Sequence, residues 1–165
     1  GINELVEAFV RLNREQPATR LVLVGTEERE LDPLSPETLR LIAETPAIEA
    51  VGHQRDVRPW LDAAHVAVLA SYREGFPNVV IEAGAMGLPQ IVTDINGANE
   101  IVVDGVNGVI VPPRDAEALY EAMRRMLDKG LRDRLAARAR EMIASRYDHN
   151  YVRRCLLDFY REILV

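Results

Sequence analysis

The first 112 residues alternate short apolar runs with stretches of helical spacing. Each run is four or five residues long, which is typical of strands buried on both faces of a parallel sheet. The runs lie at 21–25, 48–52, 66–69, 90–93 and 108–111. A first helix with apolar positions from Ile2 to Leu12 precedes them, and helical spacing returns at 36–44, 56–63 and 78–87.

The C-terminal third contains helical spacing alone. Its apolar positions predict helices from Asp115 to Met126, from Leu131 to Ile143, and from about 148 to Ile163. Alternating strands and helices require right-handed crossovers and a parallel sheet covered on both faces. The sequence therefore predicts a three-layer, Rossmann-like α/β sandwich with about five parallel strands and a helical C-terminal tail. In the last helix, Cys155 shares a face with apolar neighbours and is predicted to be a small buried residue.

Length and charge narrow the class of protein. The 165 residues fit one domain, and the net charge of −6 argues weakly against a nucleic-acid partner. A single cysteine excludes an internal disulfide and suits a reducing, cytoplasmic compartment. No apolar run approaches the ~20 residues of a membrane helix. Only Gly1 precedes the first helix, so we expect a truncated chain that lacks the preceding strand.

Candidate chemistry concentrates in the loop after the third strand. Ligands of parallel sheets gather at the carboxyl ends of strands, where loops lead into helix N-termini. In the loop 71–78, Gly75 permits unusual backbone angles, and Pro77 or Asn78 opens the next helix. The free N–H groups at the start of that helix form a favourable binding site for a diphosphate. Glu74 lies before this site and Glu82 about one turn beyond it, where their carboxylates can accept hydrogen bonds from sugar hydroxyls.

These residues also carry a family resemblance. Glu74, seven intervening residues and then Glu82, within the stretch 71–83, resemble the signature of the group-one retaining glycosyltransferases. The stretches 52–57, 85–89 and 97–108 are similar to that family as well. The resemblance covers essentially the whole chain. It implies the C-terminal, donor-binding domain of a two-domain enzyme of the GT-B type, whose N-terminal domain would be a partner.

The resemblance also implies roles for individual residues. Glu74 would be the catalytic-site carboxylate that binds hydroxyls of the transferred sugar, and Glu82 would bind the ribose. The remaining donor-binding positions implied are Gly75, Phe76, Pro77 and Asn78 beside the sugar and phosphates, His53, Arg55 and Val57 beside the base, and Gly25 and Thr26 in the same cleft.

The reaction implied is transfer of a hexose or N-acetylhexosamine from a UDP- or GDP-sugar to a hydroxyl, with retention of configuration. It belongs to polysaccharide or glycolipid biosynthesis. No metal or other cofactor is expected, and His65 and His149 show no ligand spacing. Because the family's charge-neutralising arginine and lysine lie upstream, we expect this chain alone to be inactive. Any membrane association would come through the N-terminal domain.

Other interpretations of the same residues exist. The two glutamates can be a helix-start acid and a surface carboxylate, and His53 can simply face solvent. A phosphoryl-accepting receiver domain is disfavoured, because no aspartate ends the third strand and the one lysine, Lys129, lies in a helix. A non-catalytic α/β domain that binds nucleotide or protein without transfer stays open.

Overall fold

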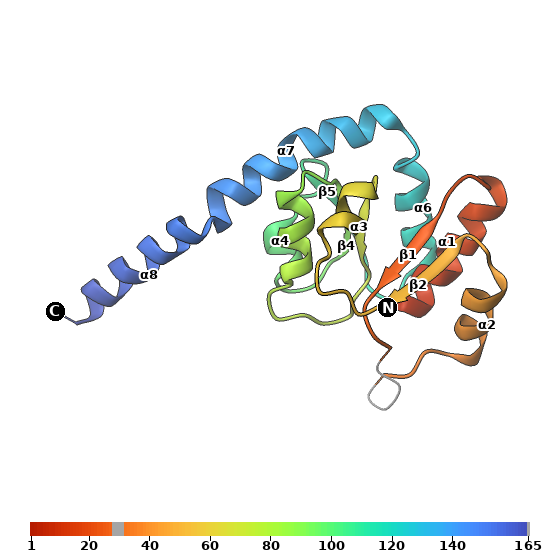
Figure 1. The fold of residues 1–165 in the computed structure, drawn as a ribbon. Coiled ribbons are helices and arrows are strands. Elements are labelled where there is room, and N and C mark those ends of the chain that lie inside the picture. Colours follow the sequence, from red (N-terminus) through yellow and green to blue (C-terminus); the bar gives the residue numbers. More distant parts are fainter. Residues whose placement is uncertain (28–31, 165) are drawn as a thin grey trace.

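The computed structural model describes residues 1–27 and 32–164, and it contains every strand predicted from the sequence (Figure 1). The strands are β1 (Leu21–Val24), β2 (Ile48–Gly52), β3 (Ala67–Leu69), β4 (Gln90–Thr93) and β5 (Gly108–Val111). The helices are α1 (Ile2–Glu15), α2 (Pro36–Glu44), α3 (Arg58–Ala63), α4 (Asn78–Ala85), α5 (Ala98–Ile101), α6 (Ala116–Arg125), α7 (Lys129–Tyr147) and α8 (His149–Ile163). The short helix α5 was not predicted, because four residues are too few for a helical period to show.

All strand pairs are parallel, but they form two sheets. β1 pairs with β2, while β3, β4 and β5 form a second sheet with β4 at its centre. Within the part of the chain that the structure describes, β1 and β3 each pair along one side only. The fold class predicted from the sequence is confirmed, and the pairing divides its sheet into two parts.

Apolar side chains cover both faces of the strands, which makes the three layers. Ile91 and Val92 follow one another in β4 and are both fully buried, yet they belong to separate apolar clusters. Successive strand residues point to opposite faces, so β4 is covered from both sides. One cluster includes α1 and α6, which pack side by side, and the other includes α4 and α7.

The last helix leaves the body of the domain. α8 extends away from the sheets beyond α7 (Figure 1), and none of its described residues is buried. Cys155 is exposed, so the prediction of a buried cysteine is wrong. The spacing of residues such as Leu156 and Phe159 shows which face of the helix is apolar, but periodicity does not show whether another element covers that face.

Candidate donor-binding site

The loop after β3 is fastened to the end of β4. The Thr93 hydroxyl donates a hydrogen bond to the backbone oxygen of Ser71. The Ser71 hydroxyl in turn donates to a carboxylate oxygen of Glu74 at 2.7 Å. Glu74 is half-buried, so its side chain is oriented by the start of its own loop while remaining within reach of solvent. A half-buried, pre-oriented carboxylate can accept hydrogen bonds from ligand hydroxyls.

The same loop packs closely against Gly97, at the start of α5. A Cβ atom placed on Gly97 would lie 2.4 Å from the Gly75 oxygen and 3.0 Å from Pro77 Cδ. Gly97 also has a φ angle of +80°, a left-handed conformation that favours glycine. The position therefore needs glycine for two reasons. In the sequence, Gly97 is the first residue of the stretch 97–108 that resembles the family, but its contact with the loop 71–78 was not predicted.

Helix α4 begins directly behind this loop. Pro77 is its buried N-cap and its first helical residue is Asn78, as the sequence predicted. The first turn carries no acidic residue, so the positive end of the helix is not neutralised from within. The ring of Phe76 packs edge-to-face on Tyr147 of α7, with ring centroids 5.5 Å apart. Phe76 can therefore serve a ligand through its backbone, since its side chain contacts α7.

A pocket of about 400 Å³ lies between the segment after β2 and helix α4. It brings together three residues that the sequence singled out separately, namely Arg55, Val57 and Glu82. Glu82 is exposed on α4, whose buried face is formed by other positions. The remaining lining residues are Asp56, Arg58, Leu61, Ala85 and Met86. The pocket thus combines guanidinium and carboxylate groups with an apolar wall, a combination suited to a ligand with both polar and flat apolar parts.

Asp56 holds the guanidinium of Arg58 at this pocket. The Asp56 carboxylate accepts hydrogen bonds from Nε and Nη2 of Arg58, each at 2.8 Å, and from its backbone N–H at 3.0 Å. The hydrogen bonds from the Arg58 side chain are the largest cause, and the bond from its backbone N–H the next, of the lowering of the pKa of Asp56 from 3.8 to about 2. The sequence placed Asp56 in the stretch 52–57 that resembles the family, but it did not predict the pairing of Asp56 with Arg58. The available signal was the aspartate itself, because an aspartate side chain commonly accepts a hydrogen bond from the backbone N–H two residues on.

The other predicted residues lie around these features without lining the pocket. The N–H of Gly25 donates to the Gly52 oxygen at 2.9 Å, which joins the ends of β1 and β2. Thr26 and His53 follow these strand ends and are exposed. Among the described residues, those lining the pocket include neither these positions nor the loop from Glu74 to Asn78.

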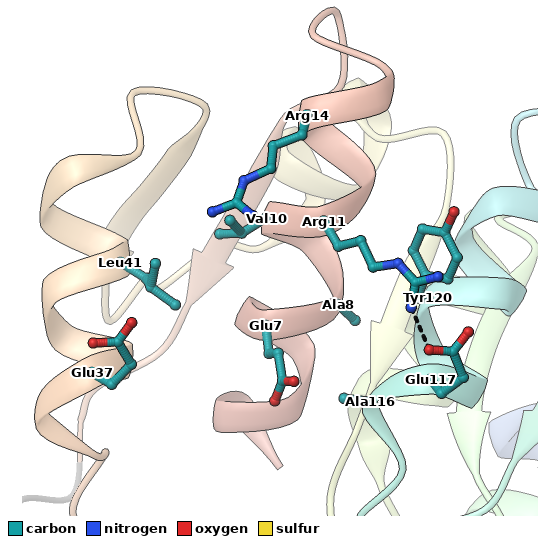
Figure 2. A pocket seen from close by; sticks show the side chains of 10 residues that line it. All are labelled: Glu7, Ala8, Val10, Arg11, Arg14, Glu37, Leu41, Ala116, Glu117 and Tyr120. Carbon is teal, nitrogen blue, oxygen red and sulfur yellow. Dashed lines mark hydrogen bonds and ion pairs between the residues drawn. The ribbon is translucent and has the colours of Figure 1, made fainter.

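A second pocket, of about 310 Å³, lies elsewhere, between α1, α2 and α6 (Figure 2). Its lining includes Arg11, Glu117 and Tyr120, and none of the residues that the sequence singled out. Arg11 stacks over the ring of Tyr120, with its guanidinium carbon 3.7 Å from the ring centroid, and pairs with Glu117. Both contacts join α1 to α6, so Arg11 is engaged with Tyr120 and Glu117 across this pocket.

Comparison with known proteins identifies the family. The model of "Glycosyl transferases group 1" matches residues 1–129. The lipopolysaccharide core biosynthesis glycosyltransferase LpsE of Rhizobium meliloti (strain 1021) is 33% identical over 167 residues, covering 99% of this chain and 46% of LpsE. The chain belongs to the group 1 glycosyltransferase family, and it spans less than half the length of this relative.

Two solved structures show which part of such enzymes the chain is similar to. The C-terminal domain of LpcC, a group 1 glycosyltransferase from Francisella tularensis, is 25% identical with a TM-score of 0.78, covering 90% of this chain and 80% of that domain. Anabaena Alr3699/HepE, solved in complex with UDP, superposes with a TM-score of 0.85 at 22% identity, covering 96% of this chain and 44% of HepE. The fold is that of a C-terminal glycosyltransferase domain. No helix in the described residues is long and apolar enough to span a membrane.

Proposed function

We propose that this chain is the donor-binding domain of a retaining glycosyltransferase that uses a nucleoside diphosphate sugar. The observation that carries the proposal is the pocket that unites Arg55, Val57 and Glu82 beside α4, in a chain of the group 1 family. The complex of HepE with UDP supports a uridine nucleotide as the ligand.

The chemistry of each group suggests its part in binding. The pocket wall formed by Leu61, Ala85 and Met86 can pack against a nucleobase, while Glu82 can accept the hydroxyls of a ribose. The diphosphate then lies at the N-terminus of α4, where free N–H groups and the helix dipole favour negative charge. Glu74, oriented by Ser71, is left to bind hydroxyls of the transferred sugar.

The transfer step needs stabilisation of the departing diphosphate. Preorganised N–H donors act strongly on charge that develops in a closed site. The helix start at Asn78 supplies such donors from this chain. The acceptor site and further cations would come from an N-terminal domain, so we propose that this chain binds donor without transferring sugar. A purely binding function remains the alternative candidate.

Within the described residues, β1 and β3 each have one side without a strand partner, which supports the proposal of one more strand between them. Gly1, at the start of α1, lies against Ala70 at the carboxyl end of β3. A parallel strand that ends at Gly1 would therefore run beside β3, and α1 would be its crossover to β1. The resulting strand order has its topological switch point next to the loop 71–78, where ligands of such folds bind.

Calorimetric titration of the chain with UDP tests the proposal. We expect measurable binding by the unaltered protein and loss of about tenfold in affinity for Glu82→Ala, the effect of one lost hydrogen bond to a charged group. Glu74→Ala should leave UDP affinity unchanged and abolish any preference for UDP-glucose over UDP.

Glu44→Ala is the control, because Glu44 is an exposed helical carboxylate on α2 that is absent from the pocket lining. If the protein does not bind UDP or GDP at millimolar concentration, the proposed function is wrong. If it binds nucleotide with equal affinity in Glu82→Ala and Glu44→Ala, the assignment of Glu82 is wrong. A preference for UDP-glucose that survives Glu74→Ala would favour a different sugar site.

A further inference from the structure

We propose that Tyr72 is a positioning residue, which holds the loop that carries Glu74 by joining it to α1 and to the loop before α6. The consequence for sugar binding rests on the proposed function, whereas the anchoring of the loop can be measured without any ligand. Tyr72 lies directly after Ser71, the residue whose hydroxyl orients Glu74.

The first anchor is a hydrogen bond to α1. The Tyr72 hydroxyl donates to a carboxylate oxygen of Glu4, 68 positions away in the chain. The pKa of Tyr72 is raised to about 12, mainly because its hydroxyl is removed from water and secondly because it donates this bond. The hydroxyl therefore stays a donor at every pH at which the protein would work. The other oxygen of Glu4 is buried and, among the described residues, has no hydrogen-bond partner.

The second anchor is Arg114, in the loop between β5 and α6. Its guanidinium carbon lies 4.7 Å from the centroid of the Tyr72 ring, a distance at which the cation is attracted to the ring face. Arg114 has a φ angle of +61°, and it is the one non-glycine residue of the described chain with a positive φ. A residue with a Cβ adopts this conformation at a cost, yet here its side chain covers Tyr72.

Two unfavourable features therefore lie beside Tyr72: Arg114 in a left-handed conformation, and a buried oxygen of Glu4 that has no hydrogen-bond partner among the described residues. Local costs of this kind are concentrated at functional sites, where the surrounding structure maintains them. The contacts of Tyr72 with Glu4 and Arg114, together with the Thr93–Ser71 bond, join the loop 71–74 to α1, to the loop before α6 and to β4. The Ser71–Glu74 bond lies within the loop and orients Glu74. Fixing the direction of Glu74 before a ligand arrives lowers the entropy lost when it binds a sugar hydroxyl.

The chain offers a matched control in Tyr120. Its hydroxyl also donates to a glutamate, Glu15, at 2.8 and 2.9 Å. Arg11 also stacks over its ring, as Figure 2 shows. This set joins α1 to α6 and contains no left-handed residue. Tyr120→Phe therefore removes a tyrosine–glutamate hydrogen bond and retains an aromatic ring under an arginine, as Tyr72→Phe does, but at a place outside the loop 71–78.

The first measurement is amide hydrogen exchange of the loop 71–78 in the ligand-free protein. We expect Tyr72→Phe and Arg114→Gly to raise the exchange rate of the loop about tenfold, the effect of losing one such contact, and Tyr120→Phe to leave it unchanged. Arg114→Lys, which retains the cation, should lie close to the unaltered protein. Exchange that stays unchanged in Tyr72→Phe would overturn the proposal, whatever the nucleotide measurements show.

The second measurement compares UDP-glucose with UDP by calorimetry. Tyr72→Phe and Arg114→Gly should lose the preference for UDP-glucose while UDP affinity stays within about twofold of the unaltered protein. Arg114→Gly should also have an unchanged or higher Tm, because glycine relieves the left-handed strain. A merely structural role predicts instead that the preference follows Tm across the variants, and that result would overturn the positioning of Glu74. If loop exchange rises but the unaltered protein binds no UDP, the anchoring is supported and the proposed function alone fails.

Discussion

The contact between Gly97 and the loop 71–78 allows a quantitative prediction. Gly97→Ala introduces a Cβ at a φ of +80° and 2.4 Å from the Gly75 oxygen. In folded proteins a Cβ atom essentially never lies less than 3.0 Å from another heavy atom of this kind, so either α5 or the loop must move. Because the other near atoms, Gly75 C and Pro77 Cδ, also belong to the loop, the strain falls on the residues beside Glu74.

Two terms add to the expected loss of stability. The left-handed conformation of an alanine costs ~1–2 kcal/mol. Forcing an extra carbon into a closely packed backbone contact costs a further ~1–3 kcal/mol. Gly97→Ala should therefore lower the free energy of unfolding by roughly 2–5 kcal/mol, a large part of the total stability of a small domain.

Gly105→Ala separates the two terms. Gly105 has a φ of +71°, but a Cβ there would meet no atom within 4 Å among the described residues. Urea denaturation followed by circular dichroism should give a loss of ~1–2 kcal/mol for Gly105→Ala and a clearly larger loss for Gly97→Ala. Equal losses in the two variants would refute the close approach of Gly97 to Gly75.

Three other outcomes test further parts of the structure. The folded pKa of Asp56 lies at about 2, below the ordinary 3.8, so its contacts with Arg58 stabilise the fold above pH 3.8 and are lost as the pH falls towards 2. A carboxyl NMR titration of Asp56 should show this low midpoint, and Arg58→Ala should return it towards 3.8; a midpoint near 3.8 in the unaltered protein would contradict the pairing. Removing residues 149–165 should change the free energy of unfolding by less than ~1 kcal/mol, since no described residue of α8 is buried, whereas a loss above ~3 kcal/mol would show that α8 packs on the body. Asp115→Ala should cost ~1 kcal/mol in urea denaturation, because Asp115 caps α6 through the N–H of Ala118 at 2.8 Å; Asp115→Asn keeps an acceptor and should recover most of the loss, and an equal loss in both would exclude the cap.

Local pattern was sufficient for the order of the elements. Each of the five strands lies within a predicted apolar run, and α2 has the predicted bounds, because apolar spacing is set by residues close together in the chain. The same reasoning selected the loop 71–78, since a glycine and a helix start after a strand are local signals. The family resemblance on Glu74 and Glu82 is likewise a matter of spacing, and the family is confirmed.

Contacts between distant residues required the tertiary structure. No spacing predicts that Tyr72 bonds to Glu4, that Gly97 touches Gly75, or that Arg58 is held at the pocket of Glu82. Each depends on how loops from separate strands meet at the edge of the sheet.

The sequence by itself determined the alternation of strands and helices, the loop with the candidate chemistry and the membership of the group 1 family. Only the tertiary structure decided that the strands form two sheets, that α8 lies exposed, and that Arg55, Val57 and Glu82 share one pocket. The physical reason is that hydrophobic periodicity records which face of an element avoids water, whereas the partner that covers the face is chosen by packing across the whole chain.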